Sequence, residues 1–153
     1  IEKGFIKVDH VHNDVREGGK RLLLNYGHTL GHAIEMATQT EEGEIFRHGE
    51  GVSLGMVAVA HIAQLHLSTP IEVGQKIKAI LKAYNLPTSF SASKLGLKRD
   101  ELIDSCARLT LKDKKRKDNQ LRFVLVNEPG SADVHTGIHN EHIIQAYQAV
   151  IKD

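Results

Sequence analysis

The sequence predicts a mostly α-helical domain with a small β element. Apolar residues recur at helical spacing in several long segments, and residues 50–67 are apolar on nearly every side. Only two short stretches near the end have strand composition. With 153 residues, of which 41% are apolar and 25% charged, the chain has the composition of an ordinary globular domain with a real core.

The first long helix is expected over residues 20–38, after the breaker Gly18–Gly19. Five polar residues in it follow one another at steps of four, three, four and three: Arg21, Asn25, His28, His32 and Glu35. This spacing puts them on one stripe of a helix. The complementary stripe is apolar (Leu23, Leu30, Ile34, Ala37, with Tyr26 at its edge). One face is therefore expected to build the core, and the other to face a polar cavity.

A second helix is expected at about 50–67, after a polar loop at 39–47 that ends at His48. Because it is apolar nearly all round, it belongs in the middle of the domain. Glycines recur four residues apart in both helices: Gly27 and Gly31, then Gly51 and Gly55. Each glycine inside a helix costs about 1 kcal/mol relative to alanine. We therefore expect the two helix backbones to approach closely; a cofactor or substrate lying against the backbone is the alternative.

The rest of the chain follows the same pattern. Further helices are expected at about 71–84, 98–109 and 142–151, a serine-rich loop at 88–98, and a strand at 121–126 that pairs with 134–138. The second of these helices, at 98–109, would turn Leu102, Ile103 and Cys106 inward, so Cys106 is expected in the core.

Charge and composition disfavour several classes of protein. Lys plus Arg (20) against Asp plus Glu (19) leaves a formal charge of +1, which gives no reason to expect nucleic acid. No apolar run approaches the ~20 residues of a membrane helix, and no signal peptide is visible. One cysteine excludes an internal disulfide and fits a reducing compartment, so a cytoplasmic location is expected.

The ten histidines are the anomaly of the composition. His28 and His32 are one helical turn apart, so both imidazoles can reach one zinc ion at ~2.0–2.1 Å, and His48 arrives at the head of the next helix. Spacing alone leaves a metal site and two hydrogen-bonded polar histidines equally open. The neighbouring Arg21, Asn25, Glu35 and Glu50 favour a functional site. A zincin protease would need Glu after the first histidine, where Thr29 stands.

Seven other histidines are expected at the surface: His10, His12, His61, His66, His135, His139 and His142.

The charge run at 112–118 predicts a solvated loop, with a clamp for phosphate or carboxylate as the alternative. Nucleic-acid binding by this run is disfavoured, because no aromatic residues are interleaved with its charges.

Two long segments of the sequence, Arg21–Glu35 and His48–Met56, closely resemble motifs of the C-terminal domain of the 3-dehydroquinate synthase family. The resemblance extends upstream to Lys7, Asp14 and Glu17, and downstream to Asp113–Lys114–Lys115 and the strand that follows. It implies the multi-helix dehydroquinate synthase-like fold with a small β-hairpin near residues 121–138. Residues 1–153 would form a single helical C-terminal domain.

The resemblance also implies an activity. The family comprises lyases of the shikimate pathway, which leads to chorismate and the aromatic amino acids, and they depend on NAD and on zinc or another divalent metal such as cobalt. They convert 3-deoxy-D-arabino-heptulosonate 7-phosphate into 3-dehydroquinate by transient oxidation, phosphate elimination, reduction and aldol closure. Zinc would act there as a Lewis acid on adjacent hydroxyls.

Roles for individual residues follow from the matched motif. His28 and His48 would be metal ligands. The phosphate would be held by His32, Asn25 and a lysine of the Asp113–Lys114–Lys115 motif, taken as Lys115. Lys7 and Arg21 would hold the carboxylate end, with Asp14 and Glu17 in the surrounding shell. The resemblance therefore implies a catalytic set of Lys7, Asp14, Glu17 and Arg21.

Two parts of the family pattern are not found in this chain: the third zinc ligand, a Glu upstream of Lys7, and the N-terminal NAD-binding domain. No glycine-rich strand–turn–helix motif for a dinucleotide is present, so residues that bind NAD are not assigned. The expected partners are the sugar phosphate, that NAD domain and, in the full enzyme, a second copy in a homodimer. The alternatives are another sugar-phosphate cyclase, of the 2-deoxy-scyllo-inosose or 2-epi-5-epi-valiolone synthase type, and a non-catalytic interaction module.

Overall fold

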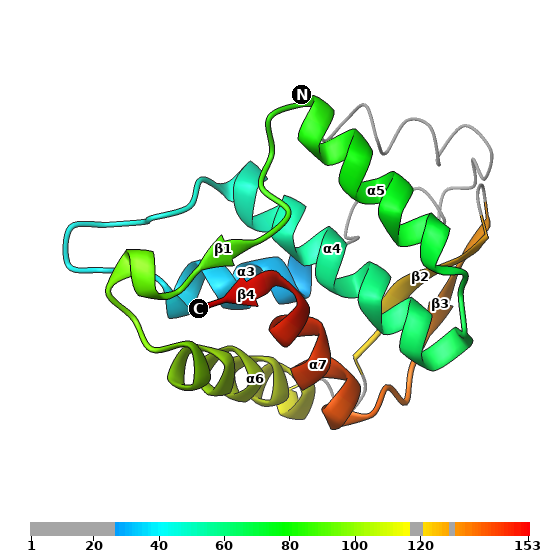
Figure 1. Cartoon of the computed structure of the whole chain (residues 1–153). Helices are drawn as coiled ribbons and strands as arrows, with labels where there is room; N and C mark the ends of the chain where they lie inside the picture. The colour runs from blue at the N-terminus through cyan, green and yellow to red at the C-terminus, as the bar shows by residue number, and fades with distance from the viewer. Residues whose placement is uncertain (1–26, 117–120, 129–130) are drawn as a thin grey trace.

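The computed structural model describes residues 27–116, 121–128 and 131–153. This part of the chain contains five α-helices, one short 3₁₀ helix and two small two-stranded sheets (Figure 1). The elements, in chain order, are α3 (His28–Ala37), α4 (His48–Leu67), α5 (Ile71–Ala83), β1 (Phe90–Ser91), η1 (Ser93–Leu95), α6 (Arg99–Arg116), β2 (Phe123–Glu128), β3 (Ser131–His135), α7 (Asn140–Val150) and β4 (Ile151–Lys152). Within the described ranges, no helix combines the length and the apolar character needed to cross a membrane.

Helix α4 lies at the centre of the molecule, with α3, α5, α7 and β2 packed around it (Figure 1). Its buried residues point in all directions around the helix and include Val52, Leu54, Val59 and Ile62. This confirms the central helix predicted at 50–67. The helix begins two residues earlier than expected, and the Glu50 carboxylate accepts a hydrogen bond of 2.8 Å from the Arg47 backbone N–H that precedes its first turn.

Helix α3 begins at His28, so the prediction of one continuous helix over residues 20–38 is wrong. Gly27 has φ +79°, in the left-handed region, and stands just before the first helical residue. A residue without Cβ adopts this conformation at little cost. The predicted stripe therefore keeps only His28, His32 and Glu35 on α3, because Arg21 and Asn25 precede it and lie outside the described residues.

The glycines of α3 and α4 mark a close contact between the two backbones, as expected. A Cβ added to Gly31 would lie 2.8 Å from the Gly51 carbonyl carbon, and one added to Gly55 would lie 2.7 Å from the Gly31 nitrogen. Real Cβ atoms do not approach other atoms this closely. The contact therefore requires glycine and fixes how α3 lies against the first half of α4.

Helix α5 packs against α4, and α6 packs against α3 and α7. The predicted helix at 71–84 is confirmed; it buries Val73, Ile77 and Leu81 and leaves Ile71 and Ile80 at the surface. Helix α6 continues to Arg116, so most of the charge run is helical rather than a solvated loop. Cys106 is fully buried in α6, as expected, and burial raises the pKa of its thiol to about 12.

Two small sheets close the fold. The predicted hairpin is confirmed: β2 and β3 are antiparallel, with Phe123 opposite His135, although β3 begins and ends earlier than the predicted segment 134–138. The second sheet was not predicted; β1, inside the supposed loop at 88–98, pairs in parallel with β4 at the end of the chain. Arg99 reinforces this junction, since its Nε donates to the Ile151 carbonyl at 2.7 Å.

Candidate metal and anion site

Three histidines meet where α3 packs against the beginning of α4. His28 is the first residue of α3, His48 is the first residue of α4, and His32 follows His28 by one helical turn. The ring centres of His28 and His48 are 5.2 Å apart, with the ring planes at 58°. Two imidazoles that bind one tetrahedral ion through nitrogens about 2.0–2.1 Å from it have ring centres roughly 5 Å apart. This pair is therefore spaced as two ligands of one metal ion.

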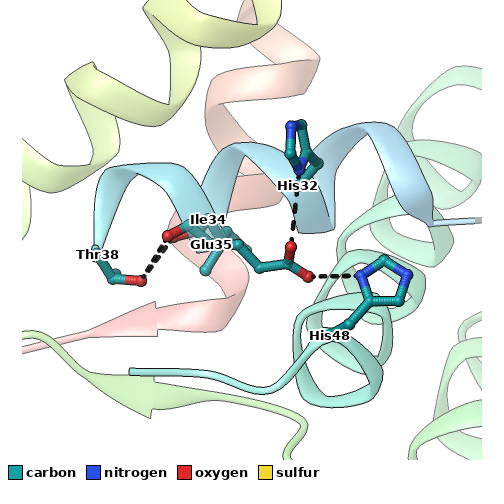
Figure 2. Close-up of polar contacts among 5 residues, drawn as sticks. All are labelled: His32, Ile34, Glu35, Thr38 and His48. Atoms are coloured by element: carbon teal, nitrogen blue, oxygen red, sulfur yellow. Dashed lines mark hydrogen bonds and ion pairs between the residues drawn. The ribbon is translucent and has the colours of Figure 1, made fainter. Parts of the chain in front are cut away.

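The carboxylate of Glu35 lies between the imidazoles of His32 and His48 (Figure 2). Its Oε2 is 3.1 Å from Nδ1 of His48, and its Oε1 is 3.6 Å from Nδ1 of His32. The Glu35 side chain is only 11% exposed, whereas those of His48 and His32 are 53% and 67% exposed. The largely buried Glu35 carboxylate thus lies behind two imidazoles that are exposed to solvent.

These histidines border a cavity of about 940 Å³. Its other walls are the last turns of α6 and the chain entering β2, which bring Lys112, Arg116 and Arg122 to the same space as His32. The cavity thus has imidazoles on one side and cationic side chains on another. This chemistry suits an anionic ligand with oxygen atoms that can also reach a metal.

The structure places the sequence-predicted residues as follows. His28, His32 and His48 lie together on the cavity; Lys115 is described but is not among the residues that line it. Lys114 contacts Asn140 on α7, with Nζ 3.5 Å from Oδ1. The remaining five predicted site residues lie outside the described part of the chain: Lys7, Asp14, Glu17, Arg21 and Asn25. Their roles stay predictions.

The sequence pointed to the charge run at 112–118 only as an alternative phosphate clamp and singled out Lys115, whereas Lys112, Arg116 and Arg122 are the cationic residues that line the cavity. Leu109, Lys112, Asp113 and Arg116 share one face of α6, and all four border the cavity. Their three- and four-residue spacing was a usable signal, but only once the helix was extended through the charge run. Arg116 is held by Asp113, with Nη2 3.2 Å from Oδ1.

The donor set fits two positions of a metal ion. Neutral imidazole is a good ligand for zinc and cobalt, and the His28–His48 spacing is appropriate for both. In the ranges that the structure describes, no group of three or more His, Cys, Asp and Glu side chains is arranged to hold a metal. The described residues therefore offer two protein ligands, which is fewer than the usual three of a catalytic site.

A second group of histidines lies at the opposite end of α4. His66 has its ring centre 5.9 Å from that of His135 and 6.4 Å from that of His142, which is 5.4 Å from His139. The prediction of surface histidines holds for His139 but not for the other three, which are half-buried. Burial, followed by the nearby His135, His142 and His139, lowers the pKa of His66.

His61 is also half-buried, so it too departs from the predicted surface position. Burial lowers its pKa, and the charges of Lys78 and Lys152 lower it further. His10 and His12 lie outside the described residues.

The chain is a helical domain in which histidine and cationic side chains border one cavity, and solved structures share its fold. One is a structure of 2-deoxy-scyllo-inosose synthase complexed with carbaglucose-6-phosphate, NAD⁺ and Co²⁺; it matches with a TM-score of 0.61 and 22% identity over 84% of this chain and 34% of its own. Another structure of 2-deoxy-scyllo-inosose synthase matches with a TM-score of 0.57 and 23% identity over 83% of this chain and 32% of its own. At this identity the likeness concerns the fold.

Sequence comparison identifies the family. Residues 3–116 match the model of the 3-dehydroquinate synthase C-terminal domain. Relatives named 3-dehydroquinate synthase occur in Acaryochloris marina (38% identical over 95% of this chain), Thermobifida fusca (37% over 98%) and Clostridium beijerinckii (39% over 84%). The chain spans 36%, 38% and 33% of the length of these relatives. It belongs to the 3-dehydroquinate synthase C-terminal domain family, as its motifs indicated.

Proposed function

We propose that this chain is the metal- and substrate-binding domain of a 3-dehydroquinate synthase. The reaction would be the NAD- and zinc-dependent cyclisation of 3-deoxy-D-arabino-heptulosonate 7-phosphate to 3-dehydroquinate with loss of phosphate, a step of the shikimate pathway. The observation that carries the proposal is the convergence of His28, His32 and His48 with cationic side chains on one cavity. The relatives named 3-dehydroquinate synthase support it, and they are more similar in sequence than the 2-deoxy-scyllo-inosose synthase structures.

His28 and His48 would hold the metal, which is zinc or another divalent ion such as cobalt. When bound, the ion supplies Lewis acidity that polarises substrate oxygens. The cobalt in the similar 2-deoxy-scyllo-inosose synthase structure supports a divalent metal in this fold. The protein's own contribution is to present two imidazoles from helices whose relative position is fixed by glycine contacts.

The phosphate of the substrate would lie across the cavity from the metal ligands. His32, Lys112 and Arg116 line the same space. A guanidinium and an ammonium group pair well with phosphate oxygens, so these side chains can hold the phosphate and orient it as a leaving group. Lys115 at the end of α6 and Asn25 are proposed to join them; Lys7 and Arg21 would hold the carboxylate end, with Asp14 and Glu17 around it.

The sequence of this chain contains no glycine-rich strand–turn–helix motif that would hold a dinucleotide such as NAD. We propose that residues 1–153 form one C-terminal domain and that a separate N-terminal domain of the same protein binds NAD. The chain matches only 36% and 38% of the length of two relatives, which supports a further domain in the full protein. A homodimer of the full enzyme and a cytoplasmic location complete the proposal.

The metal assignment is tested by zinc titration of the chain and of His28→Ala, His48→Ala and His32→Ala. Binding should be weak in the unmodified chain, since two ligands leave the usual set of three incomplete. His28→Ala and His48→Ala should each lower the affinity at least about tenfold, by loss of one ligand, while His32→Ala should leave it nearly unchanged. Equal losses in all three variants would make His32 a ligand and contradict the assignment.

The anion assignment is tested with inorganic phosphate, followed by calorimetry at low salt. Lys112→Ala and Arg116→Ala should weaken binding several-fold, and His32→Ala should do so at a pH where the imidazole is protonated. Lys115→Ala shows whether this lysine takes part. Lys114→Ala is the matched control, because Lys114 contacts Asn140 on α7. Equal affinities in the Lys112, Arg116 and Lys114 variants would place the phosphate elsewhere.

A further inference from the structure

We propose that Glu35 is a positioning residue for the metal site, because its carboxylate holds His48 in the tautomer that leaves Nε2 for the metal. Glu35 would not touch the ion or the substrate. This inference rests on the proposed function, since it concerns how one of the two metal ligands is prepared for its role.

The contact between Glu35 and His48 determines which ring nitrogen carries the hydrogen. Nδ1 of His48 is 3.1 Å from Oε2 of Glu35, which is a hydrogen-bond distance. An ionised carboxylate can only accept, so Nδ1 must donate. In a neutral imidazole the lone pair then belongs to Nε2, and this nitrogen is the one available to a metal.

The contact with His32 is of a different kind. Its Nδ1 is 3.6 Å from Oε1 of Glu35, which is beyond hydrogen-bond distance but within reach of a charge pair when His32 is protonated. Figure 2 shows the two imidazoles on opposite oxygens of the one carboxylate. Glu35 can therefore fix the tautomer of His48 and still attract a protonated His32 toward the cavity.

The carboxylate is held in place by the packing of α3 against α4. A Cβ added to Gly51 would lie 2.6 Å from Cγ of Glu35, so glycine at this position makes the space that the side chain fills. Gly51 is in the first turn of α4, where the positive end of the helix dipole favours a carboxylate. The same first turn carries His48, so the acceptor and the ligand are fixed by one local structure.

Two variants of the full 153-residue chain separate this role from general electrostatics. Glu35→Gln keeps the shape of the side chain, but its amide can donate as well as accept, so it no longer selects one tautomer. Gly51→Ala keeps the charge and displaces the carboxylate. The matched controls are Glu44→Gln, an exposed carboxylate in the preceding loop, and Gly49→Ala, where an added Cβ meets nothing within 4 Å.

The first readout is the tautomer of His48, measured without metal from the ¹⁵N shifts of the imidazole nitrogens. The unmodified chain and both controls should show His48 with hydrogen on Nδ1, whereas Glu35→Gln and Gly51→Ala should show a mixture or the other form. An unchanged tautomer in both variants would overturn the proposal. This readout does not depend on metal binding.

The second readout is a titration with Zn²⁺. Loss of a partner behind a ligand typically lowers metal affinity roughly 10–100-fold, and we expect this range for Glu35→Gln, with no change in Glu44→Gln. The Nδ1–H signal of His48 should persist in the zinc-bound chain; its disappearance would make Nδ1 the ligand atom and overturn the proposal. If the unmodified chain binds no zinc while the tautomer responds to Glu35, the proposed metal site fails and the positioning of His48 stands.

Discussion

We expect the side chain of His66 to make the stability of the fold depend on pH. Burial lowers its pKa in the folded protein, and the nearby His135, His142 and His139 lower it further. The unfolded chain, with the ordinary histidine pKa of about 6.5, therefore binds the proton first as the pH falls. The fold therefore favours the neutral side chain over the charged one. The free energy of unfolding should thus decrease as the pH falls below about 6.5, and level off only below the lowered pKa of the folded state.

The test is urea unfolding of the chain and of His66→Gln at a series of pH values between 7.5 and 5, a range of about one unit above and more than one unit below the ordinary pKa. His66→Gln should lose less stability over this range, and a residual slope should remain because the pKa of His61 is lowered as well. His139→Gln is the matched control, since His139 is exposed and makes the smallest contribution to the shift at His66. Parallel curves for the chain and His66→Gln would exclude His66 as the source.

The sequence predicted the individual residues of the site unevenly. His28, His32 and His48 could be assigned to the site from the sequence. The first two belong to one helical motif, and the third begins a second motif that also resembles the family. Lys112 and Arg116 were not assigned to the cavity, because a run of lysines gives no hydrophobic periodicity from which to extend a helix. The histidines around His66 come from α4, β3 and α7, so only the tertiary structure could bring them together.

At the scale of elements, the pair α3 and α4 positions the site. The two helices are in backbone contact at their glycines, and each begins with one proposed metal ligand. Their relative shift therefore sets the distance between His28 and His48. Any side chain inserted at the contact should push the helices apart, which would reduce both stability and metal binding.

Gly55→Ala tests this contact. Its added Cβ would lie 2.7 Å from the Gly31 nitrogen and closer still to the Gly27 carbonyl oxygen, so the backbone must move. We expect a loss of roughly 1–3 kcal/mol or more in the free energy of unfolding, measured in urea. The matched control is Gly74→Ala on α5, where the nearest atom is 4.0 Å away, and it should gain up to about 1 kcal/mol from helix propensity. A neutral Gly55→Ala would contradict the close contact.

Elements with strong periodicity were predicted well, and elements defined by local backbone conformation or by long-range pairing were not. The apolar α4 and the amphipathic α5 were predicted to within two residues at either end. The break before α3 depends on the left-handed conformation of Gly27, which a helical pattern running through that position conceals. Strands β1 and β4 have two residues each and pair across sixty positions, from Phe90 to Ile151, so neither has a period to detect.

At the scale of the whole molecule, α4 is the centre of the core that the described residues form. Helices α3, α5 and α7 and strand β2 all pack against it, and its own side chains are buried over most of its length. Tyr147 of α7 is fully buried, with its hydroxyl 2.5 Å from that of Thr110 on α6. A core of this kind, surrounded by amphipathic helices, should fold without a second domain.

We therefore expect the chain to fold cooperatively but not to catalyse. Turnover requires a hydride acceptor held within contact distance of the substrate, and no motif of this sequence would hold a dinucleotide. The measurement is phosphate release from 3-deoxy-D-arabino-heptulosonate 7-phosphate with Zn²⁺ and NAD, by the chain alone and mixed with a separately produced NAD-binding domain of a relative. The chain alone should show no release above background, and the mixture should show release that His48→Ala abolishes, because His48 is one of two proposed metal ligands. Turnover by the chain alone would contradict the requirement for a second domain. Activity of the mixture that survives His48→Ala would place the chemistry outside the cavity between α3, α4 and α6.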